Sequence, residues 1–280
     1  MPRFSIQIFL LLATFTGLSL GQTNDEFICR KIFSYAYEHR LAEKPIGDII
    51  VEVGRQLIGA PYEAHTLDQA DTEQLVANLH SFDCITFVEN VLALSRCIKS
   101  GQLSLGAYRD QLMATRYRGG VITGYTSRLH YFTDWIRDND RRGILRDVSR
   151  QLGGKPYQKS FSFMTKHRSL YAKLADDSSF LALQATEDSL RQGQFFLLPK
   201  ALIHEVSTKL QNGDIVGVTP RDSTLDVSHA GIVVKSGTGV VRYMHAPDVG
   251  GHVRISRESL SAFVGKRKSS TGIVVARVLD

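Results

Sequence analysis

Apolar residues recur every three or four positions in the first third of the chain, the spacing of one buried helix face. This pattern predicts helices over residues 25–40 and 46–57. The sequence Gly59-Ala60-Pro61-Tyr62 then interrupts the pattern and predicts a loop.

A third helix is predicted around Cys84, because apolar residues with helical spacing follow it: Ile85, Phe87, Val88, Val91, Leu92 and Leu94. Asp83 or Ser81 is the expected N-cap of this helix. Cys84 should therefore lie in the first turn of a buried helix.

The pattern changes after Gly213, where short runs of β-branched residues alternate with turn residues. These runs predict an antiparallel meander, with strands over residues 214–218, 229–234, 240–245, 252–255 and 272–278. Residues 98–205 are mostly helical in pattern, with glycine breaks. Helices followed by a sheet indicate an α+β fold.

The first 21 residues differ from the rest of the chain. Arg3 precedes an almost wholly apolar stretch, residues 6–20, and Ser19 and Gly21 place small residues before a cut at Gln22. This arrangement is typical of a secretory signal peptide over residues 1–21. A single membrane anchor is the alternative, although the stretch is short for a span of about 20 residues. We expect an exported, periplasmic or secreted protein with no stable membrane insertion after signal cleavage.

The charge distribution argues against nucleic acid as a partner. The formal net charge is +6, but the basic residues are scattered and pairs such as Arg141-Arg142 lie beside acids. A mildly basic exported protein suits an anionic cell-wall polymer.

The three cysteines are Cys29, Cys84 and Cys97. An odd count in an oxidising compartment leaves at least one thiol unpaired or reactive. Cys29 and Cys97 are candidates for a disulfide, which would leave Cys84 free.

Cys84 is the first candidate for chemistry. A helix N-terminus favours the thiolate, so its pKa is expected below about 8.5, and free amides there can stabilise an oxyanion. The alternative is a small buried hydrophobe on a core helix.

Two histidines are the expected partners of Cys84. His229 opens one predicted strand and His245 ends the next, with Ser236-Gly237-Thr238-Gly239 between the strands. A three- or five-residue loop centred on Gly237 makes the two histidines direct cross-strand neighbours, about 5 Å apart. This places an orienting group behind a base, as nucleophilic catalysis needs.

Metal binding is the competing use of these residue types. The candidate ligands lack a short Cys-x-x-Cys or His-x-x-x-His spacing, so no metal site is expected. Hydrolysis by a cysteine and a histidine needs no other cofactor.

Five short motifs occur in the order typical of the NlpC/p60 superfamily of cell-wall cysteine peptidases. They are Ala60-Pro61-Tyr62, Phe82-Asp83-Cys84, Asn212-Gly213-Asp214-Ile215-Val216, His229-Ala230-Gly231-Ile232 and Met244-His245-Ala246. The resemblance covers residues 59–97 and 210–280. It implies a papain-like, NlpC-type core, in which a helix carrying the nucleophile packs on an antiparallel sheet.

One departure from common NlpC/p60 members is the separation of Cys84 and His229, which is 145 residues. We expect one domain over residues 22–280 with a mainly helical insertion at about 98–205. The inserted sequence and the helix after Cys84 resemble a branch described as N-acetylmuramoyl-L-alanine amidase-like. That resemblance implies cleavage of the bond between muramic acid and L-alanine in peptidoglycan fragments (muropeptides), anhydro forms among them.

The resemblance also implies roles for individual residues. Cys84 is the expected nucleophile, His229 the base and His245 the orienting residue. The candidate substrate-binding residues are Tyr62, Asp83, Arg128, His130, Tyr131 and Ser228. Two structural alternatives stay open: Arg128 as a helix cap, and Tyr131 as a core residue with Trp135, four positions away.

Three other functions are alternatives. An endopeptidase that cuts between D-glutamate and the diamino acid would share the same catalytic residues. A non-catalytic wall-binding module would not need Cys84 and His229, and both are present. An acyl transferase with a similar core should carry a membrane-facing apolar segment, and none is visible after residue 21.

Overall fold

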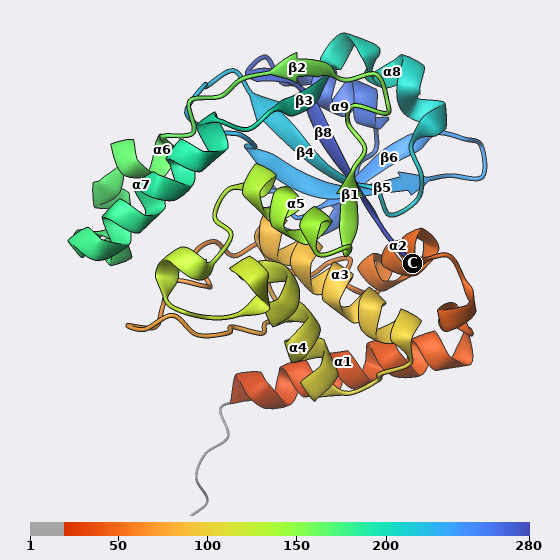
Figure 1. Cartoon of the computed structure of the whole chain (residues 1–280). Coiled ribbons are helices and arrows are strands. Elements are labelled where there is room, and N and C mark those ends of the chain that lie inside the picture. Colours follow the sequence, from red (N-terminus) through yellow and green to blue (C-terminus); the bar gives the residue numbers. More distant parts are fainter. Residues whose placement is uncertain (1–19) are drawn as a thin grey trace, which may run out of the picture.

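The computed structural model describes the backbone of residues 20–280 and the side chains from residue 24 onward. The predicted signal peptide, residues 1–21, lies almost wholly outside these described residues. Figure 1 shows a mixed α/β arrangement, with a central sheet and helices packed around it.

Nine α-helices lie in the described part of the chain. Their bounds are α1 Leu20–Glu38, α2 Ile46–Gln56, α3 Cys84–Ser100, α4 Leu105–Arg116, α5 Phe132–Arg141, α6 Phe163–Lys166, α7 Asp177–Arg191, α8 Ile203–Val206 and α9 Leu260–Lys266. The first three correspond to the helices expected from apolar spacing. No helix between residues 20 and 280 has the length and apolarity that crossing a bilayer requires.

The sheet contains eight strands. They are β1 Leu145–Asp147, β2 Lys155–Tyr157, β3 Phe195–Pro199, β4 Ile215–Pro220, β5 His229–Lys235, β6 Val241–His245, β7 Arg254–Ile255 and β8 Ser270–Val278. The order is β2-β3-β8-β4-β5-β6-β7, β1 also pairs with β8, and every pair is antiparallel.

The strand order corrects the expected meander. Strand β8 lies between β3 and β4 instead of beside β7, so the last strand of the chain is central. The region 98–205 also supplies β1, β2 and β3 in addition to its helices. Two of these strands are only three residues long, too short to show an alternating pattern in the sequence.

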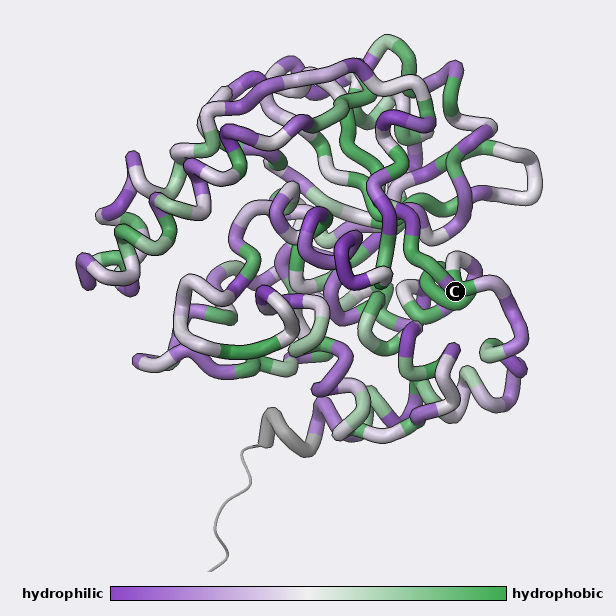
Figure 2. Tube along the Cα trace, in the orientation of Figure 1, coloured by the Kyte–Doolittle hydropathy of each residue, from purple (hydrophilic) through white to green (hydrophobic). Residues whose placement is uncertain are grey.

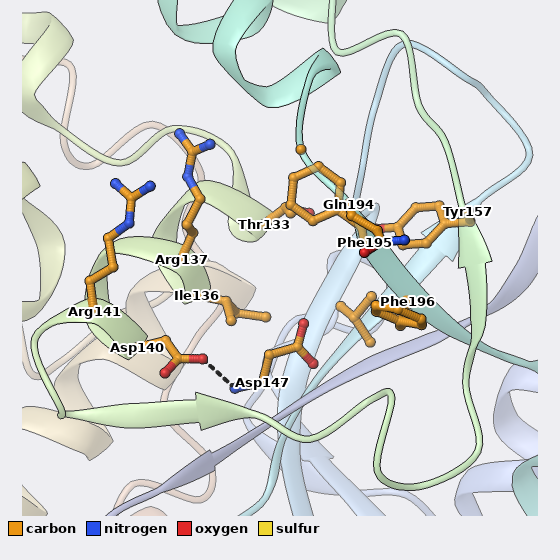
Figure 3. A pocket seen from close by; sticks show the side chains of 12 residues that line it. Thr133, Ile136, Arg137, Asp140, Arg141, Asp147, Tyr157, Gln194, Phe195 and Phe196 are labelled. Carbon is orange, nitrogen blue, oxygen red and sulfur yellow. Dashed lines mark hydrogen bonds between the residues drawn. The ribbon is translucent and has the colours of Figure 1, made fainter.

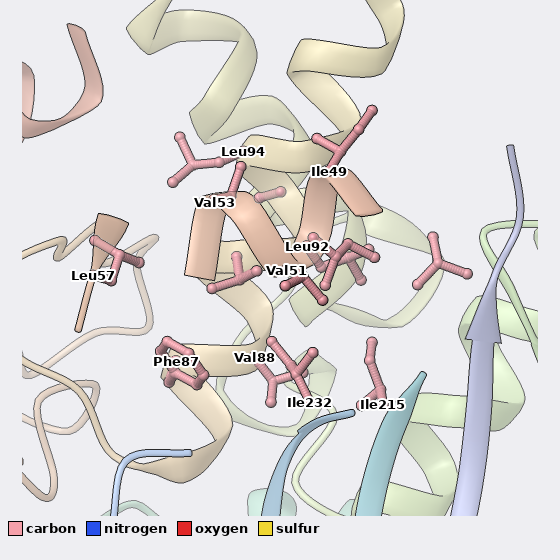
Figure 4. Packing of buried hydrophobic residues seen from close by; sticks show 14 of the residues in the cluster. Ile49, Val51, Val53, Leu57, Phe87, Val88, Leu92, Leu94, Ile215 and Ile232 are labelled. Carbon is pink, nitrogen blue, oxygen red and sulfur yellow. The ribbon is translucent and has the colours of Figure 1, made fainter. Parts of the chain in front are cut away.

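Both faces of the sheet are covered. Alternate residues of β5 point to opposite faces: Ile232 joins the core with α2 and α3, whereas Val233 joins the core with α8 and α9. Figure 4 shows Phe87, Val88 and Leu92 of α3 between α2 and the sheet residues Ile215 and Ile232. The central strands are accordingly apolar along their length, and they are green in Figure 2.

The three cysteines are free thiols in the structure. Cys29 of α1 and Cys97 of α3 are both buried and are not joined, so the candidate disulfide between them is not formed in the structure. Cys84 is partly exposed at the start of α3.

Candidate active site

The start of α3 is held by a reciprocal cap. The Asp83 side chain accepts hydrogen bonds from the backbone N–H groups of Ile85 (2.9 Å) and Thr86 (2.7 Å), and the Asp83 N–H donates to the Thr86 hydroxyl (2.9 Å). This capping box orders the first turn, where Cys84 lies. Asp83, a candidate substrate-binding residue, therefore uses its carboxylate to cap the helix.

Cys84 meets the sheet at the beginning of β5. Helix α3 packs against β5, and the backbone N–H of Ala230 lies close enough to the Cys84 sulfur to favour its thiolate. Because Ala230 directly follows His229, residues 145 positions apart in sequence are brought to one place. The sequence motifs predicted that Cys84 and His229 act together, and their assignment as a catalytic pair stays a prediction.

The two histidines form a direct hydrogen bond. His229 Nε2 lies 2.7 Å from His245 Nδ1, and the rings are nearly perpendicular. They are 5% and 2% exposed, so this polar contact is made away from water. The pair has the form of a base with an orienting group behind it.

The register that joins them differs from the expected one. Strand pairs such as Val233–Tyr243 and Lys235–Val241 centre the hairpin on Thr238, whereas the sequence analysis centred it on Gly237. The two histidines are therefore diagonal neighbours. They still share one face of the sheet. The observed register differs from the expected one by two residues, and side chains alternate between the faces with a period of two.

Aromatic rings enclose the histidine pair. Tyr243 stacks on His245 at 5.1 Å between centroids, and Phe263 of α9 lies 5.0 Å from His245 and 6.2 Å from His229. The Tyr243 hydroxyl donates to the Val216 carbonyl (3.0 Å), which fixes the ring. The sequence analysis missed both residues. Alternation within the strand could have identified Tyr243, whereas no sequence signal pointed to Phe263.

Burial is the main influence on the pKa values of Cys84, His229 and His245. It lowers the pKa of His229 to about 3 and that of His245 to about 4, and nearby Arg267 acts in the same direction. Burial and the Asp83 carboxylate raise the pKa of Cys84 to about 12. This direction is opposite to the low thiol pKa expected from the helix start, because burial disfavours the thiolate and the Asp83 carboxylate adds a negative charge. Burial therefore favours the neutral form of the Cys84 thiol and of both imidazoles.

Tyr62 lies next to the cysteine. Its segment pairs with Phe82, and the Tyr62 N–H donates to the Gly251 carbonyl (2.7 Å). Burial and the nearby Cys84 and Asp83 raise the pKa of Tyr62, so its hydroxyl is a hydrogen-bond donor at neutral pH.

A cleft of about 370 Å³ lies beside Cys84. Its lining includes Tyr62 and the residues before and after Cys84, which are Asp83 and Ile85. This volume is within the range of sites for small ligands. Its walls combine aromatic and ionisable side chains, among them Tyr62, Tyr125, Tyr131, Phe163, Tyr171, His65, Asp68, Glu89, Arg128 and His130.

Arg128 lines the cleft but already has acidic partners. Its guanidinium lies 2.5 Å from Asp68 and 3.5 Å from Glu73, and it covers the ring of Tyr125 at 5.0 Å. It is also 7% exposed. An open bidentate contact with a substrate carboxylate is therefore not what the structure shows, and Arg128 holds the loop with Asp68 and Glu73 in place.

We expect Arg128→Ala to lower the free energy of unfolding by about 3–5 kcal/mol, because it leaves the Glu73 carboxylate buried without its cation. Urea denaturation measures this loss. The exposed Arg146 of β1 offers a matched control, and Arg146→Ala should change stability by about 0.5 kcal/mol or less. Equal effects of the two variants would show that Arg128 is not structural.

Three candidate substrate-binding residues remain, which are His130, Tyr131 and Ser228. His130 is at the cleft, where its Nε2 contacts the Tyr125 carbonyl (2.9 Å). Tyr131 is a core residue, 2% exposed, and its hydroxyl donates to Glu187 (2.6 Å). Ser228 is exposed beside His229, and its N–H donates to the Val218 carbonyl (2.9 Å).

The histidine pair should also make stability depend on pH. Both pKa values are lowered from 6.5, so between pH 6.5 and about 4 the unfolded chain binds more protons than the folded chain. Stability is therefore lost as pH falls through this window, by up to about 2 kcal/mol per histidine between pH 6.5 and 5. Urea denaturation at several pH values measures the slope.

The double variant His229→Gln/His245→Gln is the control for this slope. It removes both titrating groups while leaving the other acids and bases in place. If it loses stability with acid as steeply as the parent protein, the two histidines are not buried in neutral form.

No cluster of three or more histidine, cysteine, aspartate or glutamate side chains within the described residues is suited to hold a metal ion.

Fold and site together define a mixed α/β protein with a cysteine at a helix start and a buried histidine pair on the sheet. The model of the N-acetylmuramoyl-L-alanine amidase-like (AmiA-like) family matches residues 52–273. The chain belongs to this family.

Solved structures agree with the family. An N-acetylmuramoyl-L-alanine amidase from Bacteroides uniformis is 35% identical, with a TM-score of 0.79 over 84% of this chain and 99% of that chain. A putative xylanase from Bacteroides fragilis is 36% identical, with a TM-score of 0.75 over 81% and 99%. A Legionella pneumophila protein, 20% identical, shares the fold with a TM-score of 0.69 over 93% and 96%. No curated protein sequence matches the chain.

Proposed function

We propose that this protein is a cysteine hydrolase with an NlpC-type, papain-like core, and that it cleaves the N-acetylmuramoyl-L-alanine bond of muropeptides. The observation that carries the proposal is the closeness of the Cys84 sulfur to the backbone of Ala230, the residue that follows His229, together with the His229–His245 hydrogen bond. Family membership and the amidase from Bacteroides uniformis support the choice of bond.

The first chemical step is attack by Cys84 on the amide carbonyl. His229 is neutral, so it can accept the thiol proton as the sulfur–carbon bond forms. The proton need not be transferred before substrate binds, because burial disfavours both the thiolate and the imidazolium. His245 orients the imidazole through the 2.7 Å contact.

The tetrahedral oxyanion then needs hydrogen-bond donors. Asp83 occupies the N–H groups of Ile85 and Thr86, and the Cys84 N–H has no partner among the described hydrogen bonds. The Cys84 N–H and the Tyr62 hydroxyl are the two donors that we assign to the oxyanion. Protonated His229 gives its proton to the leaving L-alanine nitrogen, and water deprotonated by His229 then hydrolyses the thioester.

The cleft beside Cys84 is the proposed place for the rest of the substrate. Aromatic rings such as Tyr125 and Tyr171 offer faces for a sugar or an apolar side chain, and ionisable groups such as Asp68 and His65 offer polar contacts. This combination suits a ligand with a sugar and a peptide part. We also propose that the protein acts after export, on the basis of residues 1–21.

The bond that is cut can be tested directly. A disaccharide-peptide is incubated with the protein and the products are identified by mass spectrometry. We expect a free disaccharide and an intact peptide that begins with L-alanine, and no cleavage of the same peptide without its sugar.

Cys84→Ala protein is the matched control, and it should give no products. If the products are instead a disaccharide-dipeptide and a shorter peptide, the D-glutamyl endopeptidase function replaces the amidase. Binding without any cleavage by the parent protein would indicate a wall-binding module.

A further inference from the structure

A second pocket lies between α5 and the edge of the sheet formed by β1, β2 and β3. Its volume is about 350 Å³, and it shares no lining residue with the cleft beside Cys84. Figure 3 shows side chains of α5, β1 and β3 around this space. The proposed hydrolysis uses none of them.

Charges of both signs line the pocket. Arg137 and Arg141 come from α5, one helical turn apart, and Asp147 comes from β1 on the facing side. Arg137 contacts Asp134 (3.1 Å), whereas Arg141 forms no ion pair with any residue that the structure describes. Arg141 is exposed at the mouth of the pocket, so it is available to an anionic group.

Asp147 is the acidic counterpart. One of its oxygens accepts the Ser149 N–H (2.8 Å), and no cation among the described residues lies within ion-pair distance of its carboxylate. The Asp140 carboxylate is a close neighbour, because it accepts the Asp147 N–H (3.0 Å). Burial and Asp140 raise the pKa of Asp147. A ligand cation between these two carboxylates would offset their repulsion.

The rest of the pocket is apolar and aromatic. Phe195, Phe196 and the ring of Tyr157 form one wall, with Ile136 and Val274 nearby. The hydroxyls of Tyr157 and Thr133 are buried close to each other.

We propose that this pocket binds an unblocked amino acid or short peptide in its zwitterionic form. Arg141 holds the carboxylate and Asp147 the ammonium group, while a side chain lies against Phe195 and Phe196. A phosphorylated ligand would face two carboxylates, and a purely cationic one would face two arginines, so a ligand with both charges fits best. The proposal does not depend on the amidase function.

The test is isothermal titration of the full-length protein with the dipeptides Phe-Ala and Ala-Ala. We expect both to bind, Phe-Ala more tightly because of the aromatic wall. Arg141→Gln and Asp147→Asn should each weaken binding roughly ten- to a hundredfold. Arg146→Gln, on the exposed face of β1, should leave binding unchanged.

Doubly blocked N-acetyl-Phe-Ala-amide separates charge recognition from apolar binding. It should not bind, because it lacks both end charges. Absence of binding by the free dipeptides at millimolar concentration would overturn the proposal. Equal binding of the blocked peptide, or full binding by Arg141→Gln and Asp147→Asn, would also overturn it. Muropeptide hydrolysis by these two variants should equal that of the parent protein, so this result is independent of the catalytic function.

Discussion

Cys84→Ala is expected to reduce muropeptide hydrolysis by roughly 10⁴-fold or more while the protein stays folded. The substitution removes the nucleophile and no part of the capping box, which is made by Asp83 and Thr86. Alanine is also favourable within a helix. Product formation followed by chromatography, together with thermal unfolding of the same sample, measures both halves of the prediction.

Cys29→Ala and Cys97→Ala are the matched controls. Both thiols are buried in the helical layer and unpaired, so each substitution should cost on the order of 1 kcal/mol of stability. Most of the activity should remain. An equal loss of activity in folded Cys97→Ala protein would contradict the assignment of Cys84.

Much of the fold could be predicted because its central elements carry clear periodic patterns. Helix α2 and strands β4, β5 and β6 lie within one or two residues of their expected bounds. The sheet order could not be predicted, since a strand's neighbours depend on contacts between distant segments. Strand β8 pairs with β4 across more than 50 residues of sequence, and nothing in its own pattern identifies that partner.

In the candidate site too, some features could be predicted from the sequence and others could not. Cys84 and His229 stand out by local context, one at a helix start and the other at a strand start. The role of Arg128 could not be read locally, because its partners Asp68 and Glu73 come from a loop some 60 residues away. The thiol pKa was misjudged because its environment is assembled from α3, β5 and the Asp83 cap.

The second prediction with a large expected effect concerns turnover after replacement of His229 or His245. His229→Asn should reduce turnover by about 10²–10⁴-fold, the usual contribution of a general acid–base group, because asparagine carries no transferable proton at neutral pH. His245→Asn should lose much less, since an amide can still hydrogen-bond the His229 Nε2 that lies 2.7 Å from His245 Nδ1. Turnover numbers at saturating muropeptide compare the two.

A pH profile tests whether the two roles are assigned correctly. The imidazole of His229 is kept neutral by burial, and Phe263 and Tyr243 cover the pair. The acid limb of kcat/KM should therefore lie well below pH 6.5 in the parent protein. In His245→Asn this acid limb should move to higher pH, because the neighbouring imidazole that lowers the pKa of His229 is gone. If His245→Asn abolished turnover while His229→Asn kept part of it, His245 would be the base and His229 the orienting residue.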